Sequence, residues 1–260
     1  MRSLALALMV LGCAAPLPPP SEGTHEPRDA AIPPPFGAVG TTAPTPPPTP
    51  RPEPADECSA RLLVIFDRSG SMNETWPDAG EPRYRVAADA LSEAIAPLSP
   101  YLAVGAILFP SGGAPDPGAC AIVDPIEAQI PYQSGASFLA AWDAYFRYAT
   151  GGGSTPLDAA FTQADHALAD VDGVSAVVVL TDGQPTCRQA VGAAEHAWLW
   201  RERGIKTWVV GLPGLSEAGV LSDVAYAGGT ESYLPVAEPE ALTAQLQTIV
   251  AGAVSQACDE

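Results

Sequence analysis

Apolar residues in this chain form short unbroken runs separated by longer amphipathic stretches. The clearest runs are RLLVIF at 61–66, LAVGAILF at 102–109 and VSAVVVLTD at 174–182. Continuous apolar runs of this length are typical of strands buried on both faces. IKTWVVG at 205–211 and ESYLPV at 231–236 predict two further strands. We therefore expect a sheet whose central strands are covered on both sides.

The stretches between these runs predict helices or, in one case, a sheet edge. Helices are expected over 85–98, 137–149, 156–170, 188–204, 216–227 and 238–256. EAQIPY at 127–132 predicts only an edge strand, because Pro131 cannot donate a hydrogen bond within a sheet. The alternation of strand and helix predicts a doubly wound α/β fold with a mostly parallel sheet and helices on both faces.

The N-terminal segment has the pattern of an export signal. MRSLALALMVLGC has one early arginine and then an apolar run too short to span a bilayer, so 1–12 is predicted to be a signal peptide. Its end, Val10-Leu11-Gly12-Cys13, resembles the lipobox of bacterial lipoproteins, which implies lipidation at Cys13. The alternative is an ordinary signal peptide cleaved near Ala15. By the same resemblance, the absence of aspartate after the cysteine favours the outer membrane, on its periplasmic face or the cell surface, over the inner membrane.

Composition divides the rest of the chain in two. The segment 13–56 contains 15 of the 29 prolines and cannot build a core, so it is predicted to be a disordered, semi-rigid tether. The remaining segment, 57–260, is long enough for one domain with a sizeable core.

The charge of the chain restricts its partners. Twelve basic and 30 acidic residues give a formal net charge of −18. This charge argues against nucleic acid and against an anionic lipid surface, so contact with a membrane is expected only through the lipid anchor. Cations or basic partners are favoured, although a well-solvated acidic surface would give the same composition.

Five oxygen-bearing residues follow the ends of predicted strands or open a helix. Asp67, Ser69 and Ser71 come directly after the strand 61–66, and Asp182 ends the run VVVLTD. Thr155 lies in the glycine-rich segment GGGSTPL before a helix. In doubly wound sheets, ligands bind beyond the carboxyl ends of the strands, where these residues would meet. Two carboxylates and three hydroxyls suit a hard cation such as Mg²⁺ rather than zinc or copper.

These three segments together resemble the metal-ion-dependent adhesion site of von Willebrand factor A domains, over residues 60–256. The resemblance implies that Ser69 and Ser71 bind the metal directly and that Asp67, Thr155 and Asp182 complete its shell, directly or through water. It implies Mg²⁺ as the ion, with Ca²⁺ or Mn²⁺ as possible substitutes. It also implies an open coordination position that an acidic side chain of a protein partner fills.

Three functions stay open at this point. The leading hypothesis is a tethered binding module that captures a protein for adhesion or envelope assembly and is not an enzyme. The second is a metal-dependent phosphatase or hydrolase with Asp67 as nucleophile, although such sites usually carry a second aspartate where Ser69 stands. The third is a structural envelope protein with a vestigial, unoccupied site. Taken alone, Asp-x-Ser-x-Ser could also be a helix cap. Trp76, just beyond the serines, could contact a partner or anchor its loop.

Four cysteines besides Cys13 suggest two disulfides in an exported domain. In the expected parallel sheet, Cys58 precedes the first strand and Cys258 ends the last helix, so both would lie at the amino-terminal edge. Cys120 and Cys187 both follow strands and would lie toward the opposite edge. The predicted pairs are therefore Cys58–Cys258 and Cys120–Cys187.

Overall fold

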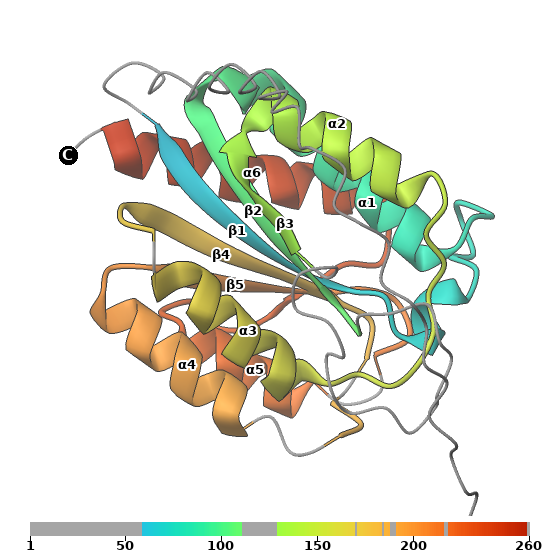
Figure 1. The fold of residues 1–260 in the computed structure, drawn as a ribbon. Helices are drawn as coiled ribbons and strands as arrows, with labels where there is room; N and C mark the ends of the chain where they lie inside the picture. The colour runs from blue at the N-terminus through green and yellow to red at the C-terminus, as the bar shows by residue number, and fades with distance from the viewer. Residues whose placement is uncertain are drawn as a thin grey trace, which may run out of the picture. The chain divides into compact units, whose positions relative to one another are not determined.

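The computed structural model describes residues 59–110, 129–169, 171–183, 185–187, 191–215 and 218–258. Its centre is one sheet in the order β3-β2-β1-β4-β5-β6, parallel throughout except for β3 (Figure 1). The strands are β1 (Ala60–Asp67), β2 (Leu102–Phe109), β3 (Gln129–Ser134), β4 (Val174–Thr181), β5 (Lys206–Gly211) and β6 (Leu234–Pro235). The predicted doubly wound α/β fold is confirmed.

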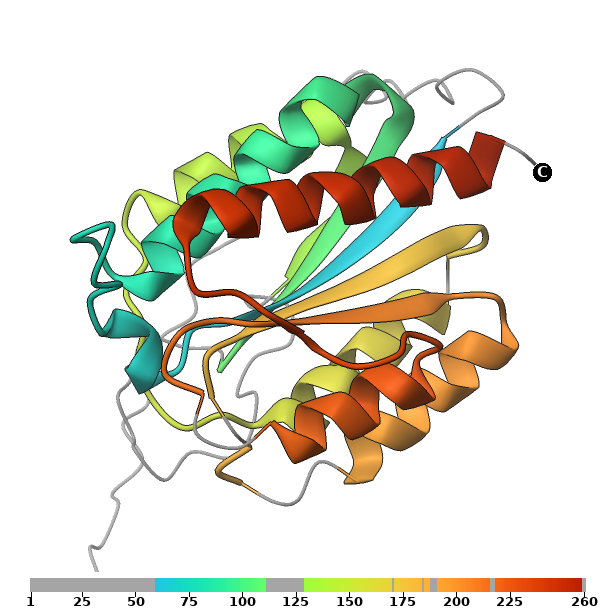
Figure 2. The same ribbon diagram turned by 180° about the vertical axis from the view of Figure 1, so that it is seen from behind.

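Helices cover both faces of the sheet. One face carries α1, α2 and α6, and the other carries α3, α4 and α5 (Figures 1 and 2). The bounds are α1 (Arg83–Ile95), α2 (Gly135–Phe146), α3 (Leu157–Ala169), α4 (Val191–Glu202), α5 (Gly219–Ala227) and α6 (Pro239–Cys258), with short 3₁₀ turns η1 (Gly70–Asn73) and η2 (Ala96–Tyr101). Each helix overlaps a stretch that the sequence pattern predicts.

The two faces of the sheet belong to two apolar clusters. In β1, Leu62, Val64 and Phe66 pack with the side of α1, α2 and α6, whereas Leu63 and Ile65 pack with the side of α3, α4 and α5. Successive side chains of a strand point to opposite faces, so a strand with a cluster on each side must be apolar throughout. This requirement explains the unbroken apolar run that predicts β1.

The two edge strands depart from the central pattern. β3 is antiparallel to β2 and lies at one edge, where Pro131 is tolerated, as expected. At the other edge, β6 contains only Leu234 and Pro235, although the sequence pattern predicts a strand over 231–236. β6 pairs with β5 alone and ends at a proline, so the ladder stops after two residues.

The register of the central strands fixes where the polar residues emerge. β1 pairs in parallel with β4, with Phe66 opposite Leu180. Asp67 and Thr181 therefore leave the sheet side by side, and Asp182 follows at the same edge. The parallel pairing of β1 with β4 brings together segments more than 100 residues apart in sequence.

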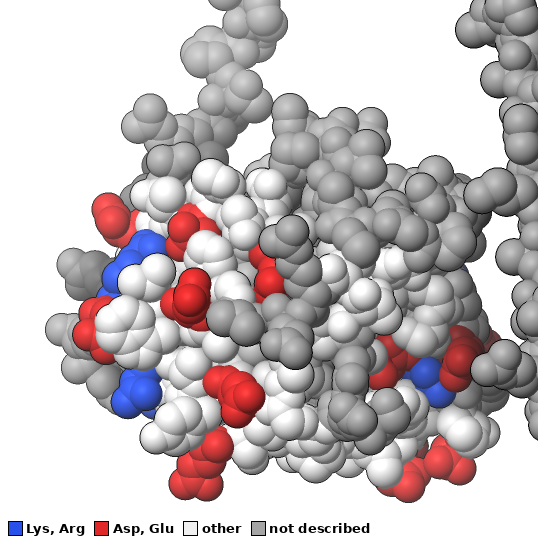
Figure 3. All heavy atoms as spheres, turned by 90° about the horizontal axis from the view of Figure 1, so that it is seen from below, with Lys and Arg blue, Asp and Glu red and all other residues white. Residues whose placement is uncertain are grey.

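Two features bear on the surroundings of the domain. Acidic side chains are spread over the face shown in Figure 3, with few basic ones among them. Within the described part of the chain, none of the helices is long and apolar enough to cross a membrane. The predicted signal peptide, the lipidation at Cys13 and the tether lie outside the described residues and remain predictions.

Candidate metal centre

Asp67 lies at the buried bottom of the polar cluster that follows the carboxyl ends of the strands. Its side chain is fully buried. The backbone N–H of Ser69 donates to Asp67 Oδ1 at 2.7 Å, and the Thr181 hydroxyl donates to Asp67 Oδ2 at 2.5 Å. Burial and the nearby Asp182 carboxylate raise the pKa of Asp67 to about 7, although the hydrogen bonds lower it. A divalent cation beside this carboxylate would favour its charged form.

The two serines connect Asp67 with Asp182. The oxygens of the Ser69 and Ser71 hydroxyls lie 3.1 Å apart. The Ser71 hydroxyl donates to Asp182 Oδ1 at 2.7 Å. The short η1 turn that follows Ser69 bends the chain, so the hydroxyls of residues two apart lie next to each other. Four of the five predicted ligands thus lie within one connected group.

Thr155 is brought to this edge by a glycine-rich loop that lies along the loop after β1. Gly152 N–H donates to Arg68 O at 2.7 Å, and Gly70 N–H donates to Gly153 O at 3.0 Å. Gly151 N–H donates to the side-chain oxygen of Asn73 at 3.0 Å. A side chain at Gly151 would approach the backbone oxygen of Ser69 to 2.9 Å, so this close contact between loops requires glycine.

Gly183 shows that Thr155 and Ser71 face a common space. A Cβ added at Gly183 would lie 3.5 Å from Thr155 Oγ1 and 3.7 Å from Ser71 Oγ. Thr155 is held on its other side by Thr186, whose hydroxyl accepts a hydrogen bond from Thr155 N–H at 2.9 Å. All five predicted residues are therefore brought together at one edge.

The donor set fits a hard divalent cation. Two carboxylates and three hydroxyls are oxygen ligands of the kind that Mg²⁺ and Ca²⁺ prefer. No group of three or more His, Cys, Asp or Glu residues suited to a metal occurs in the described ranges. Among the described residues, a cation site at this position would therefore use hydroxyls as well as carboxylates, and Asp67, Ser69, Ser71, Thr155 and Asp182 would hold it.

Sequence reasoning missed two residues that position the predicted ligands. Thr181 bonds Asp67 but lies within a strand, where a β-branched residue is ordinary. Arg83 lies beside Asp182, with Nη1 2.7 Å from Asp182 Oδ2. The only signal for Arg83 is its charge, since a cation in the first turn of a helix opposes the helix dipole.

Two neighbouring side chains are turned away from the centre. Trp76 is fully buried, and its indole N–H donates to Ala237 O at 2.9 Å, so it anchors its loop. Arg68 is also buried, donates to Pro110 O and lies over the ring of Tyr145. Neither residue is available to a partner or to a phosphate group.

Two of the four cysteines of the predicted domain lie within the described residues. Cys187 and Cys258 are both disulfide-bonded. Their predicted partners, Cys120 and Cys58, lie outside the described residues, so the pairing remains a prediction. Ser59 and Ala257, next in sequence to Cys58 and Cys258, line the same cavity, which supports that pair.

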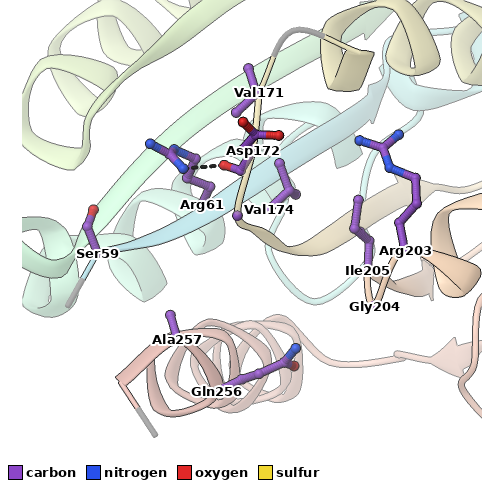
Figure 4. Close-up of a pocket in the computed structure, with 11 residues that line it drawn as sticks. Ser59, Arg61, Val171, Asp172, Val174, Arg203, Gly204, Ile205, Gln256 and Ala257 are labelled. Atoms are coloured by element: carbon purple, nitrogen blue, oxygen red, sulfur yellow. Dashed lines mark hydrogen bonds between the residues drawn. The ribbon is translucent and has the colours of Figure 1, made fainter. Parts of the chain in front are cut away.

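This cavity, of about 350 Å³, lies at the amino-terminal ends of β1 and β4 (Figure 4). The polar cluster lies at the carboxyl ends of the same strands. Arg61 and Asp172 line it, and the Arg61 guanidinium donates to the Asp172 backbone oxygen. None of the five predicted ligands lines it. The candidate centre needs room only for an ion, so it need not coincide with a large cavity.

The comparisons with known proteins identify the fold. The sequence matches no protein-family model and no curated protein. Among solved structures, the pilus adhesin SpaC from Lactobacillus rhamnosus GG has a TM-score of 0.61 at 15% identity, over 78% of this chain and 31% of SpaC. BatB from Bacteroides thetaiotaomicron has a TM-score of 0.53 at 18% identity, over 76% of this chain and 100% of BatB.

A third structure carries an occupied metal site. Proximal thread matrix protein 1 from the mussel byssus, solved with a zinc-occupied MIDAS motif, has a TM-score of 0.54 at 18% identity, over 76% of this chain and 46% of that protein. The described domain therefore shares the fold of these three structures. This chain corresponds to less than a third of SpaC and about half of the byssus protein.

Proposed function

We propose that this chain is a binding module that captures a protein partner through a divalent cation held at the carboxyl edge of the sheet. The observation that carries the proposal is the convergence of the five oxygen-bearing residues from three separate segments. Mg²⁺ is the proposed ion, and Ca²⁺ or Mn²⁺ could replace it. The cation would supply an open coordination position for an acidic side chain of the partner.

The chain's own residues would hold this centre in a fixed geometry. Thr181 and the backbone N–H of Ser69 orient the Asp67 carboxylate, and Ser71 orients Asp182. The bonded glycine loop keeps Thr155 at the same edge. A rigid oxygen set with few carboxylates suits a cation that keeps ligand positions for water or a partner.

The location of this module follows from the N-terminal sequence. We infer that 1–12 is a signal peptide, that Cys13 carries the lipid anchor and that 13–56 tethers the domain 57–260 outside the cytoplasm. The fold likeness to a pilus adhesin is compatible with a surface role. Adhesion or assembly at the cell envelope, most simply at the outer membrane, is the proposed setting.

The burial and hydrogen bonds of Asp67 argue against the phosphatase alternative. A nucleophilic aspartate must present a free oxygen to the substrate. Asp67 is fully buried and both of its oxygens accept hydrogen bonds. The only basic residue near it in sequence, Arg68, is bound to Pro110 and Tyr145. These contacts favour a non-enzymatic role.

Calorimetric titration of the purified chain with Mg²⁺ and Mn²⁺ tests the proposal. The wild type should bind one cation, and Ser69→Ala should lose most of the affinity. Capture of envelope proteins should then depend on the cation, disappear with a chelator and disappear in Ser69→Ala. Identical titrations of wild type and variant would refute the metal centre, and phosphatase turnover lost in Asp67→Asn would refute the non-enzymatic role.

A further inference from the structure

Arg83 directs a buried guanidinium at the candidate metal centre. Its Nη1 lies 2.7 Å from Asp182 Oδ2 and donates to Ser71 O at 3.3 Å. Its Nη2 lies 2.8 Å from Glu74 Oε2, whose side chain is 65% exposed. Asp182 therefore gives one oxygen to the Ser71 hydroxyl and the other to a positive charge.

Several unfavourable features accompany this placement. Arg83 is the first residue of α1, where a positive charge opposes the helix dipole. Its side chain is only 10% exposed, and its Nε has no hydrogen-bond partner among the described residues. Each of these features costs stability unless the ion pair with Asp182 compensates for it. The position of Arg83 is thus best explained by that carboxylate.

The fold also provides a specific space for the guanidinium. Gly214 follows β5 and has a φ of +103°, which favours glycine. A Cβ there would approach Arg83 Nη1 to 2.6 Å. The guanidinium is therefore enclosed by the loop after β1, the end of β4 and the loop after β5. A side chain confined in this way has little freedom to leave Asp182.

This arrangement has a direct electrostatic consequence. Asp67 and Asp182 are the only carboxylates among the five predicted ligands, and Arg83 neutralises one of them. We propose that Arg83 is a built-in counter-charge that holds Asp182 in place without a cation and lowers the affinity of the centre for divalent ions. This inference rests on the proposed cation site and adds what sets its affinity.

The strength of the site would then be a balance between two positive charges. A divalent cation and the guanidinium both lie near Asp182 and repel each other, and this repulsion is large where water is excluded. The negative charge of the exposed Glu74 carboxylate offsets part of the positive charge that Arg83 places beside Asp182. A centre of this design is ordered in the absence of the ion and releases it readily.

Mn²⁺ titration of the full-length protein tests the inference, with Arg83→Gln compared with Arg85→Gln. Both variants remove one positive charge from α1, but Arg85 lies over the ring of Tyr84, whereas Arg83 is paired with Asp182. Arg83→Gln should bind Mn²⁺ about tenfold more tightly than the wild type. Arg85→Gln should remain within about twofold of it.

Thermal unfolding with and without Mn²⁺ distinguishes this role from a purely structural one. Without cation, Arg83→Gln should unfold at a lower temperature than the wild type, because Asp182 loses its partner. Its gain in melting temperature on saturation with Mn²⁺ should exceed that of the wild type. Equal losses with and without Mn²⁺, together with an unchanged affinity, would mean that Arg83 only supports the fold and would overturn the inference. Weaker Mn²⁺ binding would overturn it as well.

A second pair of variants covers the case in which Arg83→Gln does not fold. Glu74→Gln removes the negative charge that offsets Arg83, so Mn²⁺ binding should weaken about threefold. Glu81→Gln makes the same charge change on an exposed residue that forms no ion pair with Arg83 in the described structure, and should have no effect. Equal affinities of these two variants would contradict the inference. A wild type that binds no cation would instead refute the proposed function, so the two failures are distinguishable.

Discussion

The hydroxyl of Ser71 donates a hydrogen bond to Asp182 Oδ1 at 2.7 Å, across 111 residues of sequence. The contact exists because β1 and β4 are neighbouring parallel strands whose carboxyl ends lie at one edge. The other oxygen of Asp182 is bound to Arg83. A carboxylate shared between a hydroxyl and a guanidinium links the proposed metal site to the stability of the fold.

Removal of the Asp182 carboxylate should therefore have two effects. In Asp182→Ala the buried Arg83 loses its main partner, so the free energy of unfolding without cation should fall by about 3 kcal/mol. Ser69→Ala removes a hydroxyl that interacts with the Ser71 hydroxyl and with the Asp67 carboxylate, and should cost about 1 kcal/mol. Both variants should bind Mg²⁺ at least tenfold more weakly.

Urea unfolding in chelator and calorimetric titration measure these two effects separately. Ser222→Ala, on α5, serves as a control that should change neither quantity. If Asp182→Ala were as stable as Ser69→Ala, the ion pair with Arg83 would contribute nothing to the fold.

The raised pKa of Asp67 predicts how cation-free stability changes with pH. Asp67 has a pKa of about 7 in the folded protein, raised mainly by burial and then by Asp182, against 3.8 as its ordinary value. Between these values the folded state holds a proton that the unfolded state has released. The contribution of Asp67 to stability is therefore fully present below about pH 4 and is lost as the pH rises toward 7, by on the order of 2–4 kcal/mol.

The measurement is urea unfolding in chelator at pH 5 and pH 8, in the wild type and in Asp67→Asn. The stability difference between the two proteins should change in favour of the variant as the pH rises. Saturating Mg²⁺ should reverse the trend in the wild type, because the cation favours the charged carboxylate. A pH-independent difference would contradict the raised pKa.

Gly183 offers a way to block the centre with little change to the fold. Its φ is not in the left-handed region, and an added Cβ would make ordinary contacts of 3.5 and 3.7 Å with Thr155 and Ser71. Gly183→Ala should keep its melting temperature within about 2 °C. Its cation affinity should fall at least tenfold, because the methyl group occupies the space that the two hydroxyls face.

Gly219→Ala, at the start of α5 where nothing lies within 4 Å of an added Cβ, is the matched control and should bind like the wild type. Calorimetry and thermal unfolding of both variants decide the point. Unchanged binding in Gly183→Ala would mean that the ion does not lie between Thr155 and Ser71.

Sequence pattern predicts the central strands and singles out the five candidate ligands, but not the residues that contact Asp67 and Asp182. Asp67 and Asp182 stand out because polar residues directly follow apolar strands. Arg83 looks like any charged residue of a surface helix, and Thr181 like any strand threonine. Their roles depend on which loops pack together, which no local pattern records. The pattern predicts the strand β6 but not its short length, because β6 pairs only with β5 and ends at Pro235.

The two predicted disulfides bear on the stability of the fold and on the proposed export of the chain. The Cys58–Cys258 bond would close a loop of about 200 residues and should contribute several kcal/mol of stability in the chain-entropy model. The Cys120–Cys187 bond would hold the loop that carries Thr186, which bonds the backbone of Thr155. Non-reducing peptide mapping by mass spectrometry should recover these two pairs, and Cys58 joined to Cys120 would contradict the topology argument.

Separate removal of the two bonds should then give different results. Cys58→Ser with Cys258→Ser should lower the free energy of unfolding by about 2–5 kcal/mol and leave cation affinity unchanged, because the predicted bond would lie at the amino-terminal ends of the strands, away from the candidate centre. Cys120→Ser with Cys187→Ser should weaken cation binding, because Thr186 and then Thr155 lose their support. Parallel unfolding and Mg²⁺ titration of the two double variants test this division, and equal cation affinities in the two would show that the Cys187 loop does not position Thr155.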